Sequence, residues 1–270
     1  MRAFLSAVEK SGKHWRSNEI VEALAGLSLE SFGTYVSGAV AQERNADINF
    51  HVSDHAFSLK EALASPSFSP SSGRCPWSNN KIGCCTLYHS SDISVTWFLL
   101  PPGCVLSFHD HCLMKVWQRV FYGSISVVAV DWLSEEALPD SVRKRQREGG
   151  MGVVVDVSVH SARSECKDAA SLVTVFGPAS GGVLHEIAND SQEPALFVDV
   201  IAQPYNCPPH YFDCMYYWAT PAEHECEKVT ESDDLRGVRG VVSPGELVKL
   251  TPRPSYTGPP MEVFWPTWSW

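Results

Sequence analysis

The sequence predicts a mainly β protein whose strands close into a small barrel of the jelly-roll kind, preceded by a helical segment. From Ile82 onward, apolar and polar residues alternate at period two, as in ISVTWFLL, SISVVAVDW and ALFVDVIA. Glycine, proline, aspartate or charged residues bound each run, and most runs are too close together for a crossover helix. About seven or more antiparallel strands are expected, and so many strands must close on themselves.

The composition is that of a globular chain. The 270 residues are 44% hydrophobic and 19% charged, which provides enough apolar surface for a core and excludes disorder as the main state. The formal net charge of −10 repels polyanions, so we expect no nucleic-acid or membrane partner and favour a small or cationic one. No segment approaches the roughly 18 apolar residues that a membrane span requires. We therefore expect a soluble protein. A monomer is a separate expectation.

The cysteines indicate a reducing compartment. They are odd in number, and no secretory segment precedes them, which favours free thiols in the cytoplasm, with the nucleus as the second compartment. There are nine: Cys75, Cys84, Cys85, Cys104, Cys112, Cys166, Cys207, Cys214 and Cys226.

The first 65 residues are expected to form a helical extension. Ser17 can cap a helix in which Ile20 and Leu24 recur at helical spacing, and Phe32, Val36 and Val40 continue the pattern. Residues 66–80 are rich in serine, proline and glycine and read as a linker. The barrel domain is then expected to span residues 81–270.

Two segments interrupt the strand pattern. Residues 133–150 are charged throughout and carry Arg143, Lys144, Arg145 and Arg147. A nuclear-localisation or polyanion-binding patch is one interpretation, but we favour a solvated insertion between two strands. The chain ends in FWPTWSW, whose tryptophans we expect to pack back on the barrel, because exposed aromatic residues this dense would aggregate.

The stretch SFHDHC contains the first candidate ligands. His109 and His111 are two apart on a predicted strand, so their imidazoles share one face while Asp110 points the other way. Asp110 is thereby excluded as a ligand beside them, and a third ligand must come from elsewhere. His185 follows a Gly-Gly turn at the start of another predicted strand.

The spacing of these residues resembles the two motifs of the cupin barrels, which have a double-stranded β-helix fold: Gly103-x5-His109-x-His111-x11-Gly123 and Gly182-x2-His185-x3-Asn189. Most cupins supply a glutamate shortly after the second histidine, whereas this region holds Lys115 and Val116. A site of three histidines follows from this departure. Three neutral imidazoles suit Fe(II), Zn or Cu and leave the full metal charge to attract an anion such as a thiolate.

A closer resemblance is to the thiol dioxygenases that include cysteamine dioxygenase and the plant cysteine oxidases. It rests on HDHCLMKVWQRVFYGSISVVAVDW, GGVLHEIAND, LFVDVIAQPYN, HYFDCMYYW and PGELVKLTPRPSYTGP, in this order over roughly residues 80–265. The resemblance implies a non-haem Fe(II) enzyme that adds both atoms of O2 to a thiol and yields a sulfinic acid. His109, His111 and His185 would be the iron ligands.

The same resemblance suggests four further site residues. Asp199 matches the family's acidic residue and could pair with a substrate ammonium or accept its proton, although a carboxylate bonded to barrel backbone is the alternative. Tyr205 matches the aromatic residue that follows and could otherwise be a packed residue at the rim. Cys214 and Tyr216 would share one face of a strand, so we consider a thioether crosslink beside the simpler interpretation of a buried pair.

Several functions remain open from the sequence. The leading hypothesis is oxidation of an N-terminal cysteine of a peptide or protein, which the resemblance would place in oxygen sensing through an N-degron. Cysteamine is the second substrate, and a metal-binding cupin module without oxygen chemistry is the third interpretation. His160, His210 and His224 fall outside the motif spacing and are expected to be loop or surface residues.

Overall fold

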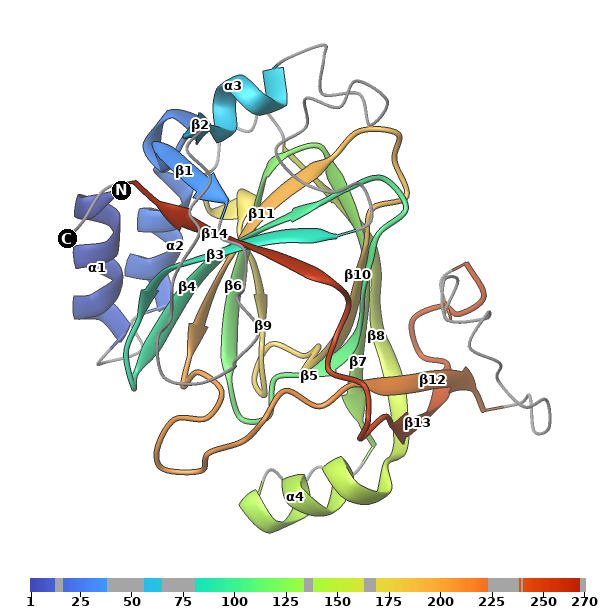
Figure 1. Ribbon diagram of the computed structural model, residues 1–270. Coiled ribbons are helices and arrows are strands. Elements are labelled where there is room, and N and C mark those ends of the chain that lie inside the picture. Colours follow the sequence, from blue (N-terminus) through green and yellow to red (C-terminus); the bar gives the residue numbers. More distant parts are fainter. Residues whose placement is uncertain are drawn as a thin grey trace, which may run out of the picture.

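The computed structural model describes residues 1–12, 17–37, 56–64, 81–133, 138–162, 169–222, 238 and 240–267. Two sheets form its body (Figure 1). The first contains, in spatial order, β2 (Phe57–Ser58), β1 (Thr34–Ser37), β14 (Met261–Pro266), β3 (Ile82–His89), β4 (Ile93–Leu100), β11 (Ala195–Ala202), β6 (Lys115–Tyr122) and β9 (Thr174–Phe176). The second contains β12 (Tyr217–Pro221), β13 (Leu247–Pro252), β8 (Gly150–Ser161), β7 (Ser124–Trp132), β10 (Leu184–Ala188) and β5 (Val105–Asp110).

The two sheets enclose one apolar interior. Val116 and Phe197 of the first sheet and Ile125, Val127 and Ile187 of the second belong to the same buried cluster. Successive residues of a strand face opposite sides. A polar residue two positions away from one of these apolar residues therefore also faces the interior. The mainly β, double-stranded β-helix barrel expected from the sequence is confirmed.

The N-terminal segment packs against the outer face of the first sheet (Figure 1). It forms α1 (Arg2–Gly12), α2 (Ser17–Ala25), the 3-10 helix η1 (Leu29–Phe32) and α3 (Leu59–Ala64). The indole Nε1 of Trp117 donates to Ser17 Oγ at 2.9 Å, and Arg119 Nη1 donates to the carbonyl oxygens of Leu24, Ala25 and Leu27. The N-terminal helices therefore share a core with the barrel. Arg119 of the barrel binds the carbonyl groups at the C-terminal end of α2.

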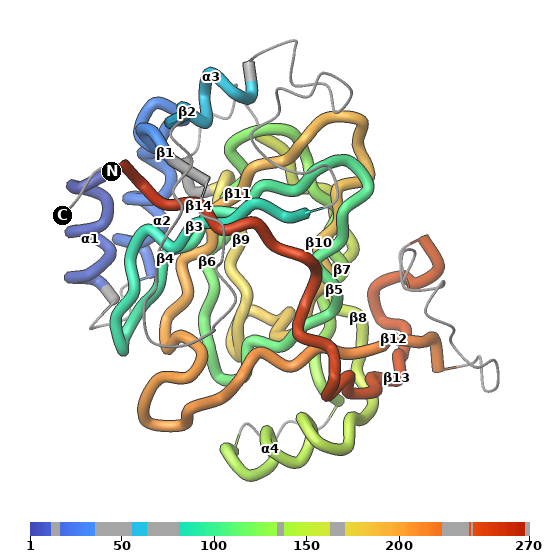
Figure 2. Tube along the Cα trace, viewed as in Figure 1, coloured from blue at the N-terminus to red at the C-terminus, as the bar shows by residue number. Residues whose placement is uncertain are grey.

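One part of the helical prediction is wrong. Residues around Val36, expected to continue a helix, form β1, which pairs antiparallel with β14. Figure 2 shows the C-terminal strand passing along β3 to reach this N-terminal strand. A partner so distant in sequence overrides the local helical spacing. Val40 and the expected linker 66–80 lie outside the described residues.

The charged segment is more ordered than a solvated insertion. Its residues Pro139–Glu148 form α4 at one end of the barrel (Figure 1), and the side chain of Val142 is buried. Arg143 lies 5.3 Å from the ring of Phe212 and donates to the carbonyl oxygen of His210 at 3.0 Å. Some basic residues of this segment thus take part in packing.

No helix in the described part of the chain is long and apolar enough to span a bilayer.

The aromatic C-terminus packs differently from our expectation. Phe264 is fully buried and stacks on Trp97 at 5.6 Å, whereas Trp265 is 48% exposed. The alternation of β14 explains the difference, since adjacent residues of a strand face opposite sides. Trp268 and Trp270 lie outside the described residues.

The non-ligand residues of the two cupin-like motifs close turns. The backbone N–H of Gly103 donates to the carbonyl oxygen of Asn189 at 2.8 Å, and Asn189 N–H donates to that of Cys104 at 3.0 Å. The side chain of Asn189 also donates to the carbonyl oxygens of Leu100 and Glu193. The spacing between these residues is therefore a requirement of the barrel as well as of the site.

Gly123, which joins β6 to β7, offers a test of this packing. Its φ is +65°, and a Cβ would lie 2.3 Å from the carbonyl oxygen of Pro194. We expect Gly123→Ala to lower the free energy of unfolding by about 2 kcal/mol or more, measured by denaturant titration. Gly103→Ala is the control, because Gly103 has φ +77° but no atom within 4 Å of a Cβ. Equal losses in the two variants would contradict the steric explanation.

Candidate metal centre

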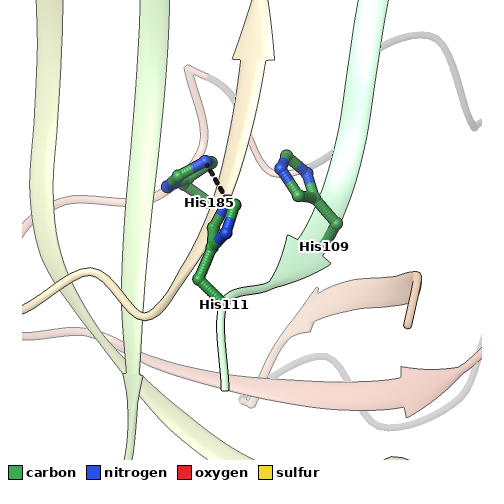
Figure 3. A group of neighbouring side chains, drawn as sticks. All are labelled: His109, His111 and His185. Carbon is green, nitrogen blue, oxygen red and sulfur yellow. Dashed lines mark hydrogen bonds between the residues drawn. The ribbon is translucent and has the colours of Figure 1, made fainter. Parts of the chain in front are cut away.

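Three histidines meet on the inner face of the second sheet. His109 on β5 and His185 on β10 are directly opposite each other in the antiparallel register, and His111 lies just after the end of β5 (Figure 3). One nitrogen from each ring lies within 4.8 Å of the others. Their side chains are 5%, 2% and 0% exposed for His109, His111 and His185. The structure thus brings together the three residues that the sequence nominated.

Hydrogen bonds fix the outward nitrogens of two rings. Nδ1–H of His109 donates to the carbonyl oxygen of Ser107 at 2.9 Å. The Tyr205 hydroxyl donates to the carbonyl oxygen of Asp110 at 2.5 Å, so its oxygen can accept Nδ1–H of His111 at 2.9 Å. Each bond places the proton on Nδ1 and leaves the lone pair on Nε2. Tyr205 therefore orients His111 as outer residues orient ligands in metal sites.

Burial keeps the three imidazoles uncharged. It lowers the pKa of His109 to about 4. Burial, followed by the charges of neighbouring histidines, lowers the pKa values of His111 and His185 well below the ordinary value. Neutral imidazoles with free lone pairs are the form that binds metal.

The distances fit a metal ion. Nε2 of His111 lies 3.1 Å from Nε2 of His185. Two imidazole nitrogens bound at about 2.1 Å and at right angles on one ion would be about 3 Å apart. Without a cation or a proton between them, two lone pairs at this separation in a buried site would repel each other. The donor set therefore suits a first-row transition metal.

Asp110 supports the site from behind. As the alternation predicts, its carboxylate points away from the ligands; it accepts bonds from Cys112 Sγ, Gln146 Nε2, Tyr217 Oη and the backbone N–H of Met215, at 2.8 to 3.1 Å. Burial raises its pKa, against the effect of these donors. The carboxylate joins the ligand strand to α4 and to β12. The sequence excluded Asp110 as a ligand and gave no signal for this role.

Asp199 also faces the barrel interior. On β11 it occupies the same face as Phe197 and Ile201, and Gln118 Nε2 of the neighbouring β6 donates to its Oδ1 at 3.0 Å. Burial raises the pKa of Asp199 to about 7. Gln118 was missed in the sequence, although a polar residue between Val116 and Val120 on the inward face was a usable signal.

Tyr216 lies beside His109, with the two ring centroids 6.0 Å apart, and Cys214 comes two residues before it. Residues 211–215 are not in a strand, so the expected strand geometry is wrong; Tyr216 instead forms an isolated bridge with His109. Burial, followed by the charge of Asp110, raises the pKa of Cys214 to about 12, while hydrogen bonds with the Tyr205 and Tyr216 hydroxyls oppose this rise. The thiol is therefore in its neutral form beside the two tyrosines.

His160 is not a loop residue, contrary to our expectation. It lies on β8, in register with Ile125 of β7. Its Nε2 is 2.7 Å from Ser158 Oγ, which donates to Asp156, and its Nδ1 is 2.8 Å from Thr174 Oγ1. The period-two spacing of Asp156, Ser158 and His160 was a usable signal for this row, whereas Thr174 comes from another strand. His210 stacks on Phe212, and His224 lies outside the described residues.

A family model described as PCO_ADO matches residues 41–261. The chain belongs to this family. Its curated relatives include plant cysteine oxidase 1 of Arabidopsis thaliana, 25% identical over 63% of this chain and 51% of the relative. Human 2-aminoethanethiol dioxygenase is 29% identical over 48% of this chain and 50% of the relative. The chain thus spans about half the length of the relatives it matches.

Solved structures of cupins are also similar. A cupin superfamily protein from Desulfitobacterium hafniense has a TM-score of 0.31 and 10% identity, covering 50% of this chain and 90% of its own. The cupin domain of Cnp3 from Schizosaccharomyces pombe has a TM-score of 0.29 and 11% identity, covering 45% of this chain and 64% of its own.

We expect His185→Ala to reduce the metal content of the reconstituted PCO_ADO protein to about one tenth or less, because a buried nitrogen donor is lost. Elemental analysis after gel filtration measures the effect, and circular dichroism checks the fold. His210→Ala is the control, since His210 stacks on Phe212 away from the cluster. Full metal content in His185→Ala would show that the ligand set is wrong.

Tyr205→Phe should weaken metal binding by about 10-fold to 100-fold, because Nδ1–H of His111 loses its acceptor. A competition titration with a chromogenic chelator measures the affinity. Tyr122→Phe removes a hydroxyl that contacts Glu193 and should leave the affinity unchanged. Matching affinities in the two variants would assign Tyr205 to packing alone.

Proposed function

We propose that this protein is a non-haem Fe(II) thiol dioxygenase that converts an N-terminal cysteine of a peptide or protein to cysteine sulfinic acid. The reaction balances as R–SH + O2 → R–SO2H. The observation that carries the proposal is the set of three buried, neutral histidines converging within 4.8 Å in a PCO_ADO chain. The names of the relatives, cysteine oxidase and aminoethanethiol dioxygenase, support a thiol substrate.

His109, His111 and His185 would hold the iron. When bound, the iron would supply a dipositive centre that binds a thiolate and activates O2, while the electrons that reduce O2 come from the thiol sulfur. Because the three ligands are neutral, they leave the metal charge uncompensated, and this favours an anionic sulfur over a neutral ligand. The buried barrel excludes bulk water, which strengthens every electrostatic interaction at the site.

The other site residues would act around the substrate. Asp199 would pair with the substrate ammonium or accept its proton, and Tyr205 would hold His111 in its binding orientation. We propose that Cys214 and Tyr216, whose side chains influence each other's pKa, modulate the site or form a thioether crosslink, in which the two hydrogen atoms lost pass to O2. The free thiols among the described residues support a reducing compartment such as the cytoplasm or nucleus, where an oxidised N-terminus could act in an N-degron.

Cysteamine is a second candidate substrate. The human relative is named for 2-aminoethanethiol, which carries the same thiol and amine as an N-terminal cysteine. The two substrates differ in the peptide chain that extends from the carbon beside the amine. A direct comparison of turnover separates them.

The decisive assay incubates the Fe(II)-loaded protein with a Cys-initiated peptide, cysteamine and free cysteine under oxygen. We expect the peptide to gain two oxygen atoms by mass spectrometry, and the gain to require both iron and an unblocked thiol. Oxidation of cysteamine alone would assign the second substrate. Absence of oxygen uptake with any thiol, together with tightly bound zinc, would favour a metal-binding module.

Asp199→Asn should retain iron and lower turnover of the Cys-initiated peptide by about tenfold or more, because a charged hydrogen-bond acceptor is lost. In the wild type, the raised pKa of Asp199, about 7, keeps the carboxyl protonated below that pH. Turnover should therefore rise as pH increases through about 7, and this rise should be weaker in the variant. Identical pH profiles and rates would return Asp199 to a structural role.

A further inference from the structure

We propose that Gln118 is a specificity residue whose amide oxygen accepts an N–H from the amine of the thiol substrate. Gln118 and Asp199 would together form an ammonium subsite within the barrel, which selects thiols that carry an amine two carbons from sulfur. This inference deepens the proposed function and rests on it for the position of the substrate sulfur.

The orientation of the Gln118 amide is set by its neighbour. When Asp199 is ionised, Nε2 faces its carboxylate at 3.0 Å, since only the NH2 group of Gln118 can donate to it. The opposite atom, Oε1, is buried and has no hydrogen-bond partner among the described residues. The Gln118 side chain as a whole is 1% exposed. A buried acceptor without a donor is therefore turned into the barrel.

A buried acceptor without a donor destabilises the folded protein unless a ligand supplies the donor. Leaving a buried polar atom unpaired costs about 1–3 kcal/mol, and native structures contain few examples. Val116 and Val120, the inward-facing neighbours of Gln118 on β6, show that this face accommodates aliphatic side chains. An apolar residue at position 118 would avoid the cost. The glutamine is better explained by a donor that arrives with the substrate.

The strand registers place Gln118 near the histidines. Val116 pairs with Phe176 of β9, and the Phe176 ring lies 4.6 Å from that of His185. Gln118 is two residues further along β6, about 7 Å, on the same face. Asp199 pairs with Gln118 in the register of β11. The Gln118 amide and the Asp199 carboxylate thus lie in one row of inward-facing residues. The adjacent row, which contains Val116 and Phe176, contacts the metal centre.

The donor that fits this pair is an ammonium. Asp199 supplies charge, and Gln118 supplies a neutral acceptor on the adjoining strand, so a group with several N–H bonds satisfies both. A substrate held by its sulfur at the histidines presents its α-amine only a few bonds away. A thiol without an amine would leave both acceptors unpaired and would bind less well.

The test compares two peptides by anaerobic calorimetry with the Fe(II)-loaded protein. One begins with cysteine; the other begins with a 3-mercaptopropionyl group, which keeps the thiol and lacks the amine. We expect the wild type to prefer the first peptide, and Gln118→Met to reduce the preference about tenfold. Gln118→Glu replaces the NH2 donor with a carboxyl that stays protonated beside the Asp199 carboxylate, so it can donate to Asp199 and still offer an acceptor. This variant should retain the preference within about threefold, and it provides a second test if Gln118→Met does not fold.

Gln146→Met is the matched control. Gln146 donates to Asp110 and to the carbonyl oxygen of Asp213, behind the histidines, so its loss should change the affinity for both peptides by the same factor. An equal change for both peptides in Gln118→Met, or a lost preference in Gln118→Glu, would overturn the inference. Failure of the proposed function is visible separately, as a wild type that binds the peptides and adds no oxygen.

Discussion

The site depends on the antiparallel pairing of β5 with β10. This register sets His185 directly opposite His109, and the alternation within β5 returns His111 to the same face. If the β5–β10 register slipped by one residue, His185 would face away from the barrel interior and Leu184 would face into it. The turns made by Gly103 and Asn189 hold that register from one end. The metal site is consequently a property of the barrel's hydrogen-bond ladder rather than of a flexible loop.

Each buried polar side chain of the site has to compensate for its own burial. Asp110 does so through four donors, and Asp199 does so in part through Gln118. The three histidines remain neutral, and a metal would complete their lone pairs. Polar groups with full sets of partners stiffen the walls, while incompletely paired ones identify the places where ligands bind. Some buried polar groups therefore support the fold, and others are available to bind a ligand.

The sequence predicted the elements that depend on local pattern. Period-two alternation located the barrel strands, and the motif spacing nominated all three histidines, because both signals are short in range. It did not predict β1, whose partner is the last strand, or α4, whose packing on Phe212 is non-local. The donors to Asp110 from α4 and β12 were missed because packing and register cannot be read from one strand alone. Gln118 and His160 each carry a period-two signal in their own strand, and only their partners on neighbouring strands, Asp199 and Thr174, were beyond the reach of the sequence.

The pairing of β1 with β14 has a consequence for how the chain folds. Thr34 accepts a hydrogen bond from Thr267, which is 233 positions away in the sequence. During synthesis the N-terminal helices emerge first, yet the strand that secures them is among the last residues described. Phe264 of β14 belongs to the same buried cluster as Phe4 and Leu24, so this cluster is complete only after β14 has been made. The barrel strands should therefore form the early folding nucleus, with the N-terminal segment docking late and slowly.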